Sequence, residues 1–274
     1  MNALANLRVC GAWARGLGVL CVCACVVGGC AQPGTYKRGA AGLIDLMAPP
    51  PPEEAAKLAR NPYSANDRYR GTTQLAGQVY GARPENVQIY MDNAGDADPG
   101  VRAAAVRALG LHGSADQAGL VARRLSDEDA AVRVEAARTL QRVHAPQVVP
   151  ALIERLSADR EGEAKVRYEA ARALGQYREG RVVEALIGTL ADDEFVVTGA
   201  CAWSLRVLTG QDFSTDSRAW LAWYKSVKDP FEAGSGYTYP VFSRGKYVWE
   251  YIPFLPQPPN EAAGLPVGMS PSVQ

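Results

Sequence analysis

The chain has 274 residues, of which 47% are hydrophobic and 21% are charged. This composition is ordinary for a folded soluble protein and argues against a largely disordered chain. Basic and acidic side chains balance at 29 each. Because a nucleic-acid-binding surface normally needs a clustered excess of lysine and arginine, the balance argues against a nucleic-acid partner.

The first thirty residues have the pattern of a bacterial export signal. Arg8 and Arg15 lead into the apolar run 16–29, which is shorter than the ~20 apolar residues that a transmembrane helix needs. The run ends in Val-Gly-Gly followed by Cys30. This resembles the bacterial lipobox, although Val and Gly stand where Leu and Ala or Ser are commoner.

The resemblance implies that residues 1–29 are a lipoprotein signal peptide and that Cys30 is lipidated and tethers the chain to a membrane. An ordinary signal peptide or a retained N-terminal anchor is the alternative. Ala31 follows the cysteine in place of aspartate, which in lipoproteins of two-membrane bacteria favours the outer membrane. We therefore expect a protein of the cell envelope, with its body in the periplasm or the exterior.

Cysteine usage agrees with export. Five of the six cysteines fall within the first thirty residues, and Cys201 is the one cysteine of the body. A single thiol cannot form an intramolecular disulfide, so the body must be held by its hydrophobic core. Cys201 occupies a small core position of a repeat, which predicts burial rather than reactivity.

Residues 30–52 are rich in Gly, Ala and Pro and end in four consecutive prolines. Such a run favours the extended polyproline conformation. We expect this segment to be a spacer between the lipid and the body.

The middle of the chain repeats one nine-residue pattern four times. Apolar residues stand at the first, fifth and ninth positions, and the fifth residue is small, which is the spacing of one helix face. The four copies begin 31, 34 and 31 residues apart, at Val101, Val132, Val166 and Val197. We interpret them as the second helices of a helical-hairpin repeat.

Another pair of apolar residues four apart precedes three of these segments and predicts the first helix of each hairpin. The pairs are Val121 and Leu125, Leu152 and Leu156, and Leu186 and Leu190. Acidic turns at 126–129, 157–159 and 191–193 separate the two helices and are expected to cap the second one. A hairpin of roughly thirty residues cannot bury its apolar face alone, so neighbouring hairpins must stack.

The pattern Val-Arg-x-x-Ala-Ala-x-x-Leu-Gly resembles the HEAT-like repeats first named from phycobilisome lyases, over about residues 97–209. Ankyrin and tetratricopeptide signatures are missing. The resemblance implies an all-α fold, an α-solenoid of helical hairpins over residues 53–228, and a binding or scaffolding role for a protein partner. Because those relatives include a lyase that attaches bilin pigments, an enzyme accessory is one alternative, which tetrapyrrole absorbance would reveal. A purely structural envelope component is another.

Both ends of the array are expected to be capped. Residues 67–75 keep the arginine, the small fifth residue and the final leucine of the pattern, which predicts a degenerate leading unit. Trp220, Trp223, Tyr224 and Val227 follow helical spacing after the capping-type residues Ser214 and Thr215. They predict an aromatic helix that covers the other end.

Residues 229–274 form an aromatic and Pro-rich C-terminal extension. Alternating aromatics at Tyr237 and Tyr239 and at Tyr247, Trp249 and Tyr251 suggest a β-hairpin. Its aromatic face could pack on the terminal helices, which we favour, or bind a partner. After about residue 257 we expect disorder.

The candidate protein-binding residues occupy the seventh position of the four repeats: Arg107, Arg138, Arg172 and Trp203. Stacking would align them along one face. Alternatively, Glu135 and Glu169 pair with Arg138 and Arg172 on their own helices as weak exposed pairs. The second-position arginines Arg102, Arg133 and Arg167 are expected to form a cross-repeat ladder with turn carboxylates such as Asp98 and Asp129.

No catalytic motif is recognisable in the sequence, and a non-catalytic protein without cofactor, metal or small-molecule substrate is expected. His112 and His144 lie near predicted helix ends, where an imidazole can satisfy terminal carbonyls. Two histidines without a clustered third ligand do not predict a metal site.

Overall fold

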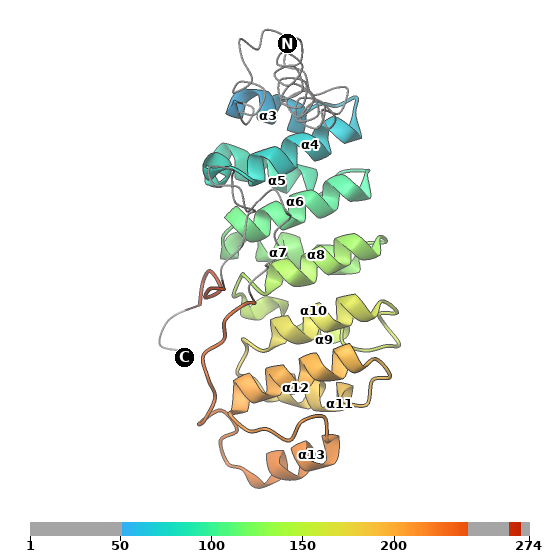
Figure 1. Ribbon diagram of the computed structural model, residues 1–274, viewed down its shortest axis with the longest axis vertical. Helices are drawn as coiled ribbons and strands as arrows, with labels where there is room; N and C mark the ends of the chain where they lie inside the picture. The colour runs from blue at the N-terminus through green and yellow to red at the C-terminus, as the bar shows by residue number, and fades with distance from the viewer. Residues whose placement is uncertain (1–50, 241–262, 270–274) are drawn as a thin grey trace, which may run out of the picture. The chain divides into compact units, whose positions relative to one another are not determined.

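The computed structural model describes residues 51–240 and 263–269, which belong to one compact unit. The expected signal peptide, Cys30 and residues 31–50 of the expected spacer lie outside the described residues. Within the described part the regular structure is helical, and helices follow one another along the stack from α3 to α13 (Figure 1). The expected all-α solenoid is therefore confirmed.

Five helical hairpins make up the described array. Their first helices are α3 (Pro52–Ala59), α5 (Pro84–Asn93), α7 (Ala118–Arg123), α9 (Val149–Glu154) and α11 (Gly180–Thr189). Their second helices are α4 (Ala65–Ala76), α6 (Pro99–His112), α8 (Ala130–Leu140), α10 (Ala164–Leu174) and α12 (Phe195–Thr209). Four short 3-10 turns, η1 to η4, lie at Val79–Ala82, Ala115–Gln117, Arg124–Ser126 and Pro146–Val148. Each second helix packs directly on the next one.

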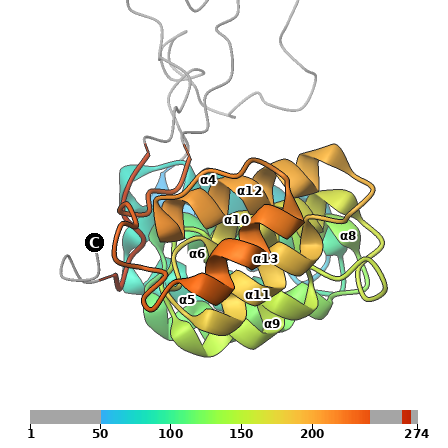
Figure 2. The same ribbon diagram turned by 90° about the horizontal axis from the view of Figure 1, so that it is seen from below.

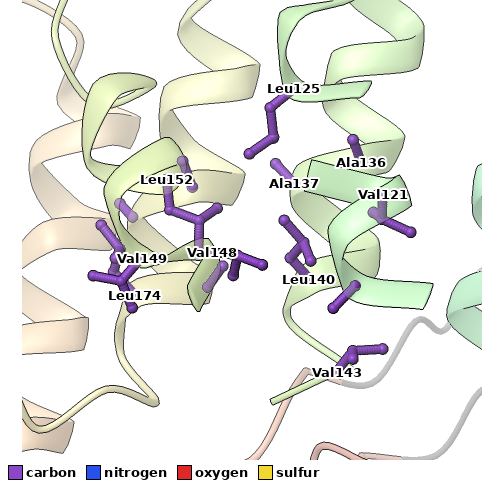
Figure 3. Packing of buried hydrophobic residues seen from close by; sticks show 14 of the residues in the cluster. Val121, Leu125, Ala136, Ala137, Leu140, Val143, Val148, Val149, Leu152 and Leu174 are labelled. Atoms are coloured by element: carbon purple, nitrogen blue, oxygen red, sulfur yellow. The ribbon is translucent and has the colours of Figure 1, made fainter. Parts of the chain in front are cut away.

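The core lies between the two layers of helices and runs through every hairpin. At α8 the first, fifth and ninth residues of the repeat, Val132, Ala136 and Leu140, are fully buried. Figure 3 shows Leu140 facing Val148 and Leu152 of the next hairpin. Burial of each such leucine contributes about 2 kcal/mol, so hairpins that could not fold singly become stable by stacking.

Small side chains let the second helices approach closely. A Cβ added at Gly110 of α6 would lie 2.8 Å from Thr139 Oγ1 of α8, and that hydroxyl donates a 3.0 Å hydrogen bond to the Val106 carbonyl. The same arrangement recurs two helices later, where Gly175 faces Ser204 and the Ser204 hydroxyl donates to the Ala171 carbonyl.

Between α8 and α10 the glycine and the hydroxyl residue of this contact are replaced by a larger and a smaller residue, respectively. Gln141 stands where α6 and α10 have glycine, and Ala173 stands where α8 and α12 have a hydroxyl residue. The Gln141 amide donates a 2.6 Å hydrogen bond to Glu169 Oε2. The interface therefore keeps its packing while gaining a buried polar contact.

A ladder of arginine–carboxylate pairs links all five hairpins. Each arginine is near the start of a second helix and binds an acid in the turn of the following hairpin with two nitrogens. The pairs are Arg68 with Asp96, Arg102 with Asp127, Arg133 with Glu161, and Arg167 with Asp192. The next arginine in turn donates to the backbone carbonyl of three of these acids, Asp96, Asp127 and Glu161. The predicted ladder thus exists.

Its acidic partners, however, were predicted wrongly. Asp98 and Asp129 are N-caps of α6 and α8, where their carboxylates accept backbone N–H groups. The acid two residues earlier in each turn reaches the arginine instead. The capping prediction for the acidic turns holds at α8 but is wrong at α10 and α12, whose N-cap residues Glu163 and Glu194 make no side-chain cap.

Three of the ladder carboxylates, those of Asp96, Asp127 and Glu161, are buried and yet have lowered pKa values. Burial raises the pKa of Asp127, but hydrogen bonds from Arg102, from the Asp129 N–H and from Arg124 outweigh it, so the pKa lies below its usual value. The same balance lowers the pKa of Asp96 beside Arg68 and the pKa of Glu161 beside Arg133. Charged side chains therefore hold the turns in register.

Both ends of the array are closed, as expected. The leading unit is the α3–α4 hairpin, and α3 begins with Pro52 at its first position, where a missing N–H costs nothing. At the other end α13 (Ser217–Ser226) lies across the last hairpin (Figure 2) and buries Trp220 completely. The N-cap of α13 is Asp216 rather than Ser214 or Thr215, because the Asp216 carboxylate accepts the Arg218 and Ala219 N–H groups.

The described parts of the C-terminal extension return to the solenoid. Val267 forms a parallel β-bridge with the segment after α8, donating to the Arg142 carbonyl and accepting from the His144 N–H, both at 2.8 Å. Tyr239 pairs with Gly264 in an isolated antiparallel bridge. The predicted partners of a hairpin, Tyr247, Trp249 and Tyr251, lie outside the described residues. The expectation of disorder after residue 257 is wrong for residues 263–269, since their backbone completes hydrogen bonds of the solenoid.

Candidate protein-interaction face

The four predicted binding residues come from consecutive second helices. Arg107 lies on α6, Arg138 on α8, Arg172 on α10 and Trp203 on α12. We call the surface that they and the outer side of α4 form the second-helix face. The structure confirms that the four share this face, but their surroundings divide it into two halves.

Arg138 is neutralised within the chain. Its guanidinium binds Glu135 on its own helix at 2.9 Å and Glu169 on α10 at 2.6 Å. The expected pair between Glu135 and Arg138 is confirmed. The expected pair between Glu169 and Arg172 is wrong, because Glu169 points to the preceding repeat and is shared by Arg138 and Gln141.

Arg172 and Trp203 form a stack that the C-terminal extension covers. The guanidinium carbon of Arg172 lies 3.3 Å from the centroid of the Trp203 ring, which is a cation–π contact. Tyr237 packs edge-on against the same indole with ring centroids 5.9 Å apart, and is 3% exposed. Burial raises the pKa of the Tyr237 phenol far above its usual value. The half of the face on α10 and α12 is therefore occupied.

The extension continues along the face to α8. The Arg142 guanidinium carbon lies 5.5 Å from the centroid of the Tyr239 ring. Tyr239 and Pro240 border a small cavity of 210 Å³ together with Arg138 and Tyr168. As favoured from the sequence, the described aromatics of this segment pack on the solenoid.

The N-terminal half of the face contains a groove between α4 and α6. Its volume is about 560 Å³. Tyr69 and Thr73 of α4 form one side, the small residues Ala103 and Ala104 form the floor, and Arg107 and Glu135 form the other side. Tyr69 is 46% exposed and Arg107 is also exposed. Of the four predicted residues, Arg107 is the one that lines this groove.

Tyr69 and Thr73 were not predicted from the sequence as parts of the site. They occupy the third and seventh positions of the degenerate leading unit, and the residues at the same positions of α6, Ala103 and Arg107, also line the groove. An alignment of α4 with the later second helices carried that signal, but the unit was considered only as a cap.

The two histidines and the cysteine have structural surroundings. His112 Nε2 lies 2.7 Å from the Ala76 carbonyl at the end of α4, as expected for a helix terminus. His144 differs, because its Nδ1 lies 3.2 Å from the Gln176 side-chain oxygen. Cys201 is buried as predicted, and burial raises its pKa. In residues 51–240 and 263–269 no three His, Cys, Asp or Glu side chains gather as metal ligands would.

Among the described helices, none combines the length and the apolar character needed to cross a bilayer. No curated protein matches the chain. The crystal structure of an engineered protein is similar to it, with a TM-score of 0.47 and 18% identity, over 67% of this chain and 98% of that one.

The sequence pattern of HEAT repeats matches residues 87–165 and, in overlap, residues 118–206. These ranges cover most of the hairpins α5–α6 to α11–α12. They also contain the ladder pairs Arg102–Asp127, Arg133–Glu161 and Arg167–Asp192. HEAT repeats are therefore found over residues 87–206, and they support the assignment of this chain as a HEAT-repeat protein.

Proposed function

We propose that this chain is a lipid-anchored, non-catalytic interaction module of the bacterial cell envelope that binds a partner protein on its second-helix face. Stacked helical repeats expose an extended surface that commonly serves as a scaffold or protein-binding surface. The observation that carries the proposal is the division of this face. The chain's own extension covers α10 and α12, while the groove beside the exposed Arg107 stays uncovered among the described residues.

Arg107 is the residue that tests the interaction. Arg138 and Arg172 bind Glu169 and Trp203 within the chain, so reversing their charge would disturb the fold as well as the surface. Arg107 is exposed on α6 and lines the groove, so its replacement by glutamate changes the charge of the groove, and a melting curve checks that the variant folds.

The experiment is reversible crosslinking in the native envelope, followed by purification of the chain and mass spectrometry. Arg107→Glu should lower the yield of one defined partner at least about tenfold, the loss expected of an important interface arginine. Arg181→Glu is the matched control, because Arg181 is an exposed arginine at the start of α11, on the first-helix side. Equal partner yield from Arg107→Glu and the original chain would overturn the proposal.

The anchor is tested separately. Two or three acyl chains are needed for stable membrane residence, and the lipobox-like Cys30 is their expected attachment point. Cys30→Ser should move the protein from the membrane fraction to the soluble fraction and remove the acylated N-terminal peptide from the mass spectrum. An unmodified Cys30 in the membrane-bound protein would contradict this part of the proposal.

A further inference from the structure

We infer that the groove between α4 and α6 binds an extended segment of the partner that carries a tyrosine-like aromatic side chain and donates a hydrogen bond to Glu135. This inference rests on the proposed function and specifies what the partner presents. It follows from a comparison of the groove with the positions that the chain's own extension already fills on the same face.

Glu135 is the repeat equivalent of Glu169, but it lacks one of that residue's donors. Glu169 Oε1 accepts from Arg138, and its Oε2 accepts from Gln141 at 2.6 Å. Glu135 Oε1 likewise accepts from Arg138, at 2.9 Å. Glu135 Oε2 is buried and has no hydrogen-bond partner among the described residues.

The reason for the missing donor is local. The position in α6 that corresponds to Gln141 is Gly110, and a larger residue there would collide with Thr139. A buried carboxylate oxygen without a donor is costly. Because the last torsion of a glutamate rotates easily, Glu135 can turn an oxygen toward the groove that it borders, where an incoming N–H or O–H would satisfy it.

The chain's own extension shows which side chains this face accepts. Tyr237 packs against Trp203 at the seventh position of α12 and beside Arg172 at the seventh position of α10. Tyr239, two residues on, lies over Arg142. The segment thus places alternate aromatic side chains against cationic and aromatic side chains of successive repeats, as an extended backbone does.

The groove between α4 and α6, toward the N-terminal end of the array, also combines a cationic and an aromatic side chain. It has an arginine at the seventh position of α6, Arg107, and an exposed aromatic ring, Tyr69, above a floor of alanines. The floor leaves room for a planar ring, and the ring contacts available to it are an aromatic pair and a cation–π pair. The extended backbone of Tyr237–Tyr239 is therefore a template for the occupant.

The test uses the full-length protein and a fluorescent peptide with the sequence of residues 233–240, Ala-Gly-Ser-Gly-Tyr-Thr-Tyr-Pro. Fluorescence anisotropy should show saturable binding with a Kd of roughly 10–100 µM. A peptide with both tyrosines replaced by alanine should bind at least about tenfold more weakly.

Two variants locate the binding. Ala103→Trp fills the groove and should weaken peptide binding at least about tenfold, whereas Ala131→Trp, at an exposed alanine of α8 outside the groove, should leave it unchanged. The double variant Gly110→Gln, Thr139→Ala gives the contact between α6 and α8 the glutamine and alanine that the contact between α8 and α10 has. The new glutamine should satisfy Glu135 and weaken the peptide about tenfold. Melting curves establish that each variant folds.

Absence of saturable binding, or equal affinity in Ala103→Trp and the original chain, would overturn the inference. Equal affinity in the Gly110→Gln, Thr139→Ala variant would overturn the role of Glu135. If Arg107→Glu abolishes partner crosslinking and the peptide still does not bind, the proposed function stands and this inference fails. If Arg107→Glu leaves partner crosslinking unchanged, the proposed function itself fails.

Discussion

Arg172 lies flat against the indole of Trp203, with its guanidinium carbon 3.3 Å from the ring centroid, across the boundary between α10 and α12. Tyr237 closes over this pair from the C-terminal extension. Three side chains from three separate elements thus fasten the extension to two repeats. The extension is part of the folded solenoid at this point, and it covers part of the second-helix face on α10 and α12.

Removal of the Tyr237 ring should release the extension. Tyr237→Ala deletes a buried aromatic side chain, so we expect a loss of about 2–4 kcal/mol in the free energy of unfolding. Hydrogen exchange should speed up at the Ser235 and Val267 amides, which bond to the solenoid. Tyr63→Ala, at a 95% exposed tyrosine, is the control and should change neither quantity. Unchanged exchange in Tyr237→Ala would show that the extension is held elsewhere.

The buried ladder should matter more than surface ion pairs. Arg167→Met leaves the Asp192 carboxylate, which is 4% exposed, without its bidentate partner, and loss of one member of a buried pair costs about 3–5 kcal/mol. Arg181→Met breaks a pair that is about half exposed on the arginine side and should cost less than ~1 kcal/mol. Urea unfolding measures both. Similar losses from the two variants would argue that the ladder does not hold the hairpins in register.

Stability should fall in acid because of the ladder carboxylates. The pKa values of Asp96, Asp127 and Glu161 are lower in the folded chain than their usual values, so the unfolded chain binds protons first. Their contribution is therefore complete above about pH 5 and is lost as the pH falls through the ordinary values near 4 toward the lowered ones. Urea unfolding at a series of pH values should show this decline. It should be shallower in Asp127→Asn, and an identical slope in that variant would contradict the assignment.

Because α6 and α8 approach closely, Gly110→Ala should have opposite effects on stability in the original chain and in a Thr139→Ala background. In the original chain Gly110→Ala should destabilise, because the new Cβ would lie 2.8 Å from Thr139 Oγ1. In a Thr139→Ala background the clash is gone, and the same substitution should stabilise by up to ~1 kcal/mol through its higher helix propensity. Thermal unfolding of the four proteins of this double-mutant cycle measures the coupling. Additive effects would contradict the packing.

The sequence was sufficient for the repeats because their signal is local. The apolar spacing at Val132, Ala136 and Leu140 reports a helix face directly, and the recurring arginine predicted a ladder. The partners of that ladder were not predictable, because Asp127 and Asp129 are both acidic and only the turn geometry decides which one caps and which one pairs.

Which part of the second-helix face the C-terminal extension covers could not be predicted from the sequence, for a different reason. Residues 231–240 and 263–269 reach α8, α10 and α12 by contacts that join residues far apart in the chain, such as Tyr237 with Trp203. No periodicity records such contacts. Arg107 and Arg172 occupy equivalent repeat positions, yet Arg107 lines the groove between α4 and α6, whereas Arg172 stacks on Trp203 beneath Tyr237.

Site-specific photocrosslinking in living cells tests the central claim most directly. A benzophenone-bearing phenylalanine replaces Tyr69 in the groove or, as a control, Phe195, an 82% exposed aromatic residue at the start of α12. The account predicts one discrete adduct from position 69 with the partner and none from position 195. An adduct from position 195 without one from position 69 would contradict the claim that the groove between α4 and α6 receives the partner.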